Sequence, residues 1–263
     1  MRLAVVIPTL DRPDALREAL ASVALQTRLP DEVHVVVDGG PRQPALETEY
    51  GERLPLRWHL LPQNVGQAAA RNFALARTEA GAVAFLDDDD LFLEPHLERL
   101  ERSLRQGPSL ALVYDDAEIW LTDGSGATPA AARRRRIERE YDAGLMRRWD
   151  YVPPCSWLAR TDALQRAGGF DATLRCYEDW DLLLRLEAWG GARRVPGPGS
   201  VVRIRRAPVE ETARAAGPNA NQSLRFDAWR GEMLARFQAK HDLRGIEPMT
   251  FWEVAQAVAV VAP

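Results

Sequence analysis

The sequence predicts an α/β fold built on a mostly parallel sheet whose two faces are covered by helices. Short apolar, β-branched runs alternate with segments of helical periodicity through the first half of the chain. These runs are continuously apolar, which is typical of strands buried on both faces. Polar turns follow several of them, and parallel sheets bind ligands beyond the carboxyl ends of their strands. The same pattern therefore indicates where a site would lie.

The first half of the chain carries the regular part of this pattern. Strands are expected at 3–7, 33–37, 56–61, 82–86 and 110–114, and helices at 15–25, 46–50, 65–76 and 95–105. Pro13 falls near the first helical position, where its fixed φ and missing N–H are tolerated. The residues Asp38-Gly39-Gly40-Pro41 form a turn after the second strand. Alternating strands and helices of this kind predict βαβ units.

The second half is less regular and predicts a smaller mixed region. Strands are expected at 117–121 and 201–204, a turn at 123–126, and helices at 161–167, 178–189, 219–241 and 251–260. Gly168-Gly169 suits the end of the first of these helices. The run Arg133–Arg136 leaves three interpretations open: a mobile surface loop, a lid over an anionic ligand, or a patch for an anionic acceptor or lipid head group.

Composition excludes several classes of protein. The 263 residues are 46% apolar and 27% charged with a net charge of -4, which is ordinary for a globular chain and does not favour nucleic-acid binding. Cys155 and Cys176 are too few for a disulfide framework and fit buried or free thiols in a reducing cytoplasm. The sequence contains no run of about 20 apolar residues, which a transmembrane helix would need.

The most informative stretch is Asp87-Asp88-Asp89-Asp90, which directly follows the apolar run Ala82–Leu86. Adjacent carboxylates repel one another and resist burial. Alternate residues of a strand end share one side, so Asp87 and Asp89 can together hold Mg²⁺ or Mn²⁺ along with phosphate oxygens. The alternative is a solvated acidic turn or a helix N-terminus.

The chain resembles family 2 glycosyltransferases, which have the GT-A fold with a Rossmann-like sheet. The resemblance rests on several blocks in a fixed order, namely Val5-Val6-Ile7-Pro8-Thr9, Ser22 to Gln26, Val35 to Gly39, Asn64 to Asn72, the aspartate run before Pro95, Gly168-Gly169-Phe170-Asp171 and Glu178-Asp179-Trp180-Asp181. It covers about Leu3 to Arg206. It implies one continuous domain with a nucleotide-sugar-binding half at 1–115, an acceptor-binding and catalytic half at 116–210, and a C-terminal helical extension at 211–263.

The resemblance assigns the nucleotide site to residues of the first half. Pro8 and Thr9 match the floor of that site. Asp38 matches the carboxylate that accepts a hydrogen bond from the base, although a turn-forming role before Gly39 is the alternative. Gly66 opens a helix whose N-terminus favours phosphate. Arg71, further along that helix, is expected to reach the nucleotide or the aspartates, with a packing helix and a surface arginine as the alternative.

The aspartates match the DxD region of the family. Asp89 is expected to bind the metal directly, and Asp87 to contact the ribose or a metal-bound water. Asp88 is included in the nucleotide site, and Asp90 is expected to cap the following helix.

The pair Glu178-Asp179 matches the family's "ED" pair. Asp179 is the candidate general base, which would take the proton from an acceptor hydroxyl during an inverting attack. Glu178 is assigned to the acceptor or sugar pocket. Trp180 is expected to wall the same pocket, with a core position as the alternative.

One departure from the family concerns the metal site. Ala207 stands where many members carry a histidine ligand, and none of the four histidines lies in a suitable place. Arg205 and Arg206 are therefore candidates to hold the diphosphate directly, because planar guanidinium groups suit phosphate.

The predicted function is that of an inverting, metal-dependent hexosyltransferase in polysaccharide or glycoconjugate biosynthesis, using Mn²⁺ or Mg²⁺. A non-catalytic nucleotide-sugar-binding module or a degenerate partner subunit is the alternative. UDP is the first expectation for the donor, with GDP and dTDP open. The acceptor is a carbohydrate, a lipid-linked or a small molecule. We expect a cytoplasmic protein, and peripheral membrane association and a homodimer stay open.

Overall fold

A computed structural model describes residues 1–122, 134–205, 224–245 and 249 of the chain. The strands are β1 (Leu3–Thr9), β2 (Glu32–Asp38), β3 (Leu56–Leu61), β4 (Ala82–Phe85), β5 (Leu91–Phe92), β6 (Leu110–Thr122), β7 (Arg134–Ile137), β8 (Trp157–Arg160) and β9 (Gly191–Arg205). The helices are α1 (Pro13–Ala24), α2 (Pro44–Gly51), α3 (Gln67–Leu75), α4 (His96–Gln106), α5 (Ala143–Met146), α6 (Thr161–Arg166), α7 (Glu178–Leu186) and α9 (Leu224–Lys240).

The strands form one sheet in the order β3-β2-β1-β4-β8-β6-β9-β5, and β7 pairs with β6. The first four strands are parallel neighbours. Beyond β4 the sheet is mixed, because β8 runs antiparallel to both of its neighbours while β6 and β9 are parallel. The predicted α/β class, with a mostly parallel part followed by a smaller mixed part, is confirmed.

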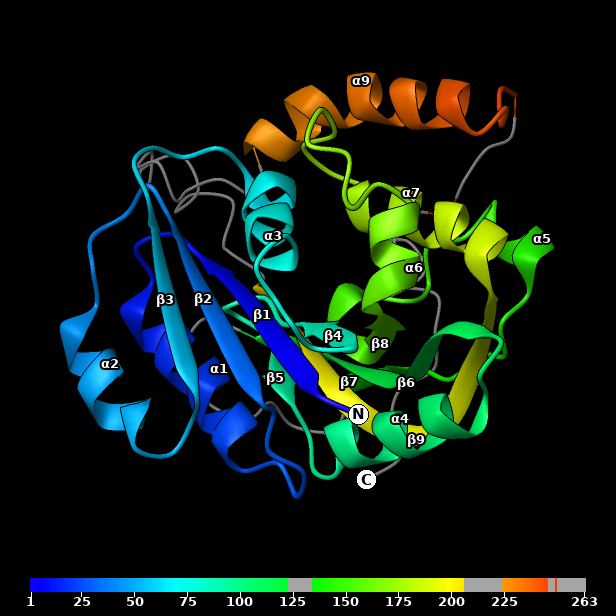
Figure 1. Ribbon diagram of the computed structural model, residues 1–263. Helices are drawn as coiled ribbons and strands as arrows, with labels where there is room; N and C mark the ends of the chain where they lie inside the picture. The colour runs from blue at the N-terminus through cyan, green and yellow to red at the C-terminus, as the bar shows by residue number, and fades with distance from the viewer. Residues whose placement is uncertain (123–133, 206–223, 246–248, 250–263) are drawn as a thin grey trace.

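Each face of the sheet packs on its own group of helices. Leu3, Val5 and Ile7 of β1 pack with α1, α2 and α4, while the alternate residues Ala4 and Val6 pack with α3, α6, α7 and α9. Figure 1 shows these two groups of helices on opposite sides of the sheet. The continuous apolar run of β1 is therefore explained, because side chains alternate between two covered faces.

The second half contains more regular structure than its sequence suggests. Two separate strands were expected at 110–114 and 117–121, but β6 is one continuous strand. Its acidic interruption, Asp115-Asp116, lies at irregularities in the pairing with β9. Asp116 accepts hydrogen bonds from Arg194 (Nε, 2.6 Å) and from the Gly197 N–H (2.8 Å) of that neighbouring strand. The carboxylate is satisfied inside the sheet, so no turn is needed.

The arginine run is also partly ordered. A mobile surface loop was one interpretation of Arg133–Arg136, but Arg134–Ile137 form β7 against β6. Arg136 donates to Glu118 (2.9 Å), and Arg134 stacks over the ring of Trp120. The interpretation of these arginines as a mobile loop is therefore wrong, while Arg133 and the expected turn at 123–126 lie outside the described residues. So does the expected terminal helix at 251–260.

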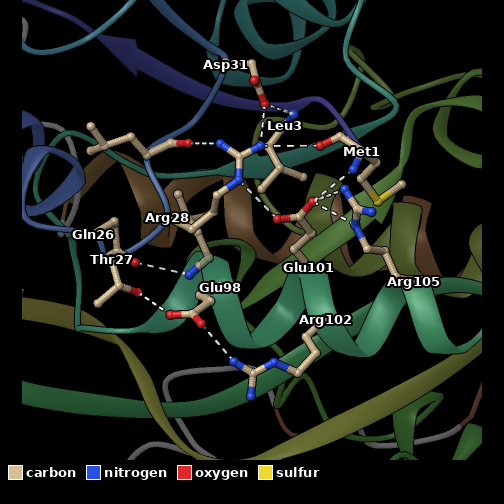
Figure 2. A network of polar contacts seen from close by, with 12 residues as sticks. Met1, Leu3, Gln26, Thr27, Arg28, Asp31, Glu98, Glu101, Arg102 and Arg105 are labelled. Atoms are coloured by element: carbon tan, nitrogen blue, oxygen red, sulfur yellow. Dashed lines mark hydrogen bonds and ion pairs between the residues drawn. The ribbon is translucent and has the colours of Figure 1, made fainter.

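A network of ion pairs holds the amino end of β1 in place. Glu101 of α4 accepts hydrogen bonds from the Met1 amino group (3.0 Å) and from Arg28 (3.1 Å). Arg28 also donates to Asp31 (2.7 Å), which accepts the N–H of Leu3 (2.8 Å) (Figure 2). The network ties α4 to the start of β1. It lies at the amino ends of the parallel strands, whereas the aspartate run lies at their carboxyl ends.

Candidate active site

Three parallel strands bring the predicted nucleotide-site residues to one edge of the sheet. β1 ends at Thr9, β2 ends at Asp38, and the aspartate run begins two residues after the end of β4 at Phe85. Pro8 is buried within β1 and lies in register with Val36 of β2. The site is therefore at the carboxyl ends of the strands, as parallel sheets require.

Asp88 is the buried member of the aspartate run. Thr9 donates its hydroxyl to Asp88 Oδ2 (2.6 Å), and Arg12 Nε donates to the same oxygen (3.2 Å). Burial raises the pKa of Asp88 to about 7, although the charge of Arg12 opposes this shift. Asp88 therefore joins the start of α1 to the end of β4 and has a supporting position within the site.

Arg12 also reaches the outer aspartate. Its Nη1 lies 2.6 Å from Asp89 Oδ2, and both side chains are partly exposed. Burial lowers the pKa of Arg12, but the charges of Asp89 and Asp88 outweigh it and the net shift is upward. Sequence reasoning missed this residue. Its only local signal is an arginine three positions after the strand end at Thr9, in the turn that opens α1.

Arg71 is a fully enclosed cation that joins the two halves of the chain. Its Nη2 lies 2.6 Å from Asp87 and its Nη1 lies 2.9 Å from Glu178, and the side chain is 1% exposed. Burial lowers the pKa of Arg71, but the charges of Asp87, Glu178 and Asp179 raise it above its usual value. Of its predicted contacts, the one with the aspartates is present, and the alternative of a surface arginine is wrong. Asp87 also accepts from Gln67 Nε2 (2.6 Å).

The predicted base and its neighbour begin α7. Burial raises the pKa of Glu178 to about 7, and the charge of Asp179 adds to this shift. Burial also raises the pKa of Asp179, against the charge of Arg71 and a hydrogen bond from the Trp180 N–H (2.9 Å). Asp179 keeps part of its surface exposed although it lies deep among its neighbours. A raised pKa brings a carboxylate closer to the range in which a general base works well.

Asp150 is a third carboxyl group beside this pair, and sequence reasoning missed it. Its side chain is 4% exposed, and its Oδ1 is buried without a hydrogen-bond partner among the described residues. Burial raises its pKa well above the usual value, and the charges of Asp179 and Glu178 add to the shift. No local pattern marks Asp150, because it reaches the site from the segment between α5 and the 3₁₀ turn at Pro154–Ser156.

Asp38 fixes the loop that leads into α3. Its carboxylate accepts the N–H groups of Val65 (2.7 Å) and Gly66 (2.9 Å). Gly66 has a φ of 91°, which L side chains rarely adopt, and it caps the N-terminus of α3. Asp38 thus has a structural role here, and its contact with a base stays a prediction.

Two further predictions differ from the structure, and a third falls at the limit of the described residues. Trp180 has no exposed surface, donates its indole N–H to the Met146 carbonyl (2.6 Å) and packs against Phe237, so it is a core residue and does not wall a pocket. Asp90 accepts the N–H of Arg203 in β9 (3.0 Å) and does not cap α4. Arg205 is the last residue of β9, while 206 and 207 lie outside the described residues.

The donor set fits a hard divalent cation only in part. Asp87 and Asp89 each keep 21% of the side chain exposed and offer oxygen ligands. Within the described part of the chain, no three acidic, histidine or cysteine side chains gather as a complete metal cage. Mg²⁺ is commonly held by one or two carboxylates plus substrate phosphates, so this pair suits a cation that arrives with a diphosphate. The histidines contact other groups, such as Asp115 for His96 and Asp181 for His241.

The sheet order and the carboxylates at its edge define an α/β protein of the GT-A type. The chain belongs to glycosyl transferase family 2, whose model matches residues 4–166. It is 29% identical over 251 residues to the uncharacterized glycosyltransferase YwdF of Bacillus subtilis, covering 95% of this chain and 88% of that one. It is 31% identical over 201 residues to the pre-mycofactocin glycosyltransferase of Mycobacterium tuberculosis, covering 72% of this chain but only 40% of that relative.

Solved structures show the same fold. TarS 1-349 from S. aureus in complex with UDP superposes with a TM-score of 0.60 at 20% identity, covering 93% of this chain and 74% of that one. The complex of the same protein with UDP-GlcNAc gives a TM-score of 0.61. In the described part of this chain, no helix is long and apolar enough to span a membrane.

Proposed function

We propose that this family 2 glycosyltransferase moves a sugar from a UDP-sugar to an acceptor hydroxyl, with inversion at the anomeric carbon. The observation that carries the proposal is the pair of contacts made by Arg71, which holds the diphosphate-side Asp87 and the acceptor-side Glu178 on one guanidinium. The UDP and UDP-GlcNAc complexes of the structurally similar TarS support the choice of donor. As in the family's usual context, polysaccharide or glycoconjugate assembly in the cytoplasm is the setting we propose.

The chemistry is a single displacement. Asp179 accepts the proton of the acceptor hydroxyl, whose oxygen forms the new bond to the anomeric carbon. The bond between that carbon and the diphosphate oxygen breaks, and the leaving diphosphate carries the electron pair. Attack from the face opposite the leaving group inverts the configuration.

The residues on the diphosphate side stabilise the negative charge that develops there. We assign Asp87 and Asp89 to hold Mn²⁺ or Mg²⁺, which when bound supplies electrostatic stabilisation of the leaving diphosphate. Arg12 adds a partly exposed positive charge beside Asp89. Arg205 and Arg206 stay proposals for direct contact with the diphosphate.

A second candidate function is nucleotide-sugar binding without catalysis. The contact between Arg12 and Asp89 favours it, because the guanidinium occupies a carboxylate that the metal would need. This candidate predicts binding of a nucleotide without consumption of a sugar donor.

The test combines binding and turnover. Melting temperatures are measured with UDP, GDP, dTDP and CDP, each with and without Mn²⁺, since a ligand that binds the folded state raises the melting temperature. UDP release from UDP-sugars is then measured for the wild type and for Asp179→Asn. We expect a UDP shift that requires Mn²⁺, and turnover that Asp179→Asn abolishes while UDP binding is retained. A UDP shift without turnover would favour the binding module, and equal loss of binding and turnover in Asp179→Asn would remove its role as the base.

A further inference from the structure

The acceptor side of the site contains more negative charge than the described cations beside it can balance. Asp150, Glu178 and Asp179 act on one another electrostatically, and Arg71 is the cation that opposes Glu178 and Asp179. Arg71 is itself shared with Asp87. An unbalanced group of buried carboxyls is costly and must hold a proton or receive hydrogen bonds.

Asp150 is the member of this group without internal support. The other buried carboxylates of the site each have at least one donor: Thr9 and Arg12 reach Asp88 Oδ2, the Arg203 N–H reaches Asp90, and Arg71 reaches Glu178. No such donor contacts Asp150 Oδ1 among the described residues. A buried acceptor atom left unmatched costs stability, so its presence needs a reason.

We propose that Asp150 is an acceptor-binding residue, and that with Asp179 it selects an uncharged polyhydroxy acceptor, a sugar or a polyol, that presents two hydroxyl groups to the site. This inference rests on the proposed function. One hydroxyl donates to Asp179 and is the nucleophile, and the second pairs with the Asp150 carboxyl. Hydroxyl groups supply the missing donors without adding charge, whereas a phosphate or carboxylate on this part of the acceptor would meet three carboxyls.

The arginines of β7 do not reverse this charge balance. Arg136 is paired with Glu118, and Arg134 lies over Trp120, both residues of β6. Neither appears among the groups that act on Asp150, which are Asp179 and Glu178 of α7. The alternative is that the arginines of β7 recognise an anionic acceptor. The experiment therefore includes an anionic probe, whose tighter binding would reveal it.

The experiment compares wild type, Asp150→Asn and the matched control Asp162→Asn, an exposed acid of α6. Each full-length protein is saturated with UDP and Mn²⁺ and titrated with methyl α-glucoside, ribitol and the anionic sugar glucuronate. We expect wild type and control to bind a neutral probe and to exclude glucuronate. Asp150→Asn should weaken neutral binding by about two- to tenfold, since a hydrogen bond to the carboxyl group is lost. Its UDP binding should stay unchanged.

Stability gives a readout that does not depend on the choice of probe. Asp150→Asn should be at least as stable as wild type at pH 8, because it removes an unsupported buried carboxyl. A marked loss of stability would overturn the proposal, since the carboxylate would then have a structural role. Unchanged binding in Asp150→Asn, tighter binding of glucuronate, or binding of neither neutral probe would overturn it as well. Absence of any UDP shift would instead count against the proposed function itself.

Discussion

Asp87, beyond the end of β4, and Glu178, at the start of α7, are joined through one guanidinium. Arg71 donates to the first at 2.6 Å and to the second at 2.9 Å, and only 1% of its side chain is exposed. The two carboxylates belong to the halves of the chain that we assign to the donor and to the acceptor. The buried side chain of Arg71 therefore sets the distance between Asp87 and Glu178 before either substrate binds. This indicates a preorganised site.

Substitution of Arg71 is expected to destabilise the protein strongly. Arg71→Gln leaves Asp87 and Glu178 without their cation, and loss of one partner of a buried ion pair costs about 3–5 kcal/mol. Unfolding in urea measures this difference. The control is Arg77→Gln. Arg77 is exposed, follows the end of α3, and its guanidinium lies over the ring of Phe73, so we expect a loss of stability below about 1 kcal/mol. Equal effects of the two substitutions would show that the buried contacts of Arg71 contribute little.

Substitution of Arg12 is expected to tighten the binding of metal alone. Its guanidinium competes with a cation for Asp89, so Arg12→Gln should lower the dissociation constant for Mn²⁺ by roughly three- to tenfold in the absence of nucleotide. Electron paramagnetic resonance of free Mn²⁺ gives the constant. Arg17→Gln, on the helix α1 that follows Arg12 and paired with Glu49, is the control and should leave Mn²⁺ binding unchanged. Weaker binding in Arg12→Gln would mean that the arginine supports the metal site.

The stability of the protein should depend on pH through Glu178. Its pKa is about 7 in the folded chain, against an ordinary value of 4.5. The folded state therefore binds the proton more tightly, and wild type loses stability as the pH rises from about 4.5 to 7. Glu178→Gln does not titrate, so its stability relative to wild type should rise across this window, by at most roughly 3 kcal/mol.

Urea unfolding of both proteins at pH 5, 6, 7 and 8 measures this trend. Glu79→Gln, at a side chain that is 70% exposed, controls for the chemical change itself. A relative stability that stays constant or falls with pH would contradict the assignment of the proton to Glu178.

Trp180 is expected to matter for stability and not for substrate binding. Trp180→Phe removes the hydrogen bond to Met146 and leaves a void beside Phe237, which should cost about 1–3 kcal/mol. Trp189→Phe is the control, because that indole is 46% exposed. Unfolding curves measure the loss, and KM for the donor sugar should stay at the wild-type value. A raised KM with unchanged stability would restore Trp180 to the wall of the site.

Sequence reasoning worked where the signal is local. The strands before Thr9, Asp38 and Asp87 were predictable, because a strand buried on both faces is a continuous apolar run and its end is marked by polar residues. The pairing of β6 and β7 was not, since the partner of Arg136 is Glu118, a contact that only the folded chain brings together.

The candidate site shows the same division. Asp87, Asp89 and Asp179 stand in recognisable spacings, and the structure brings Asp87 and Asp179 around Arg71. Asp150 has no such spacing, because its importance comes from burial beside a helix that follows it in the chain. The position of Trp180 depends on Phe237 of α9, so an aromatic residue next to a candidate base could not be assigned from its neighbours.

The bridge through Arg71 also limits how this enzyme can be re-engineered. A chimera that joins the first 115 residues to the second half of another glycosyltransferase would have to supply a carboxylate at the position of Glu178. Without it, the graft would bury an arginine with a single partner, and the hybrid would be expected to express poorly whatever its new specificity. Recombination of donor and acceptor halves in this chain is therefore best designed with Arg71, Asp87 and Glu178 exchanged as one unit.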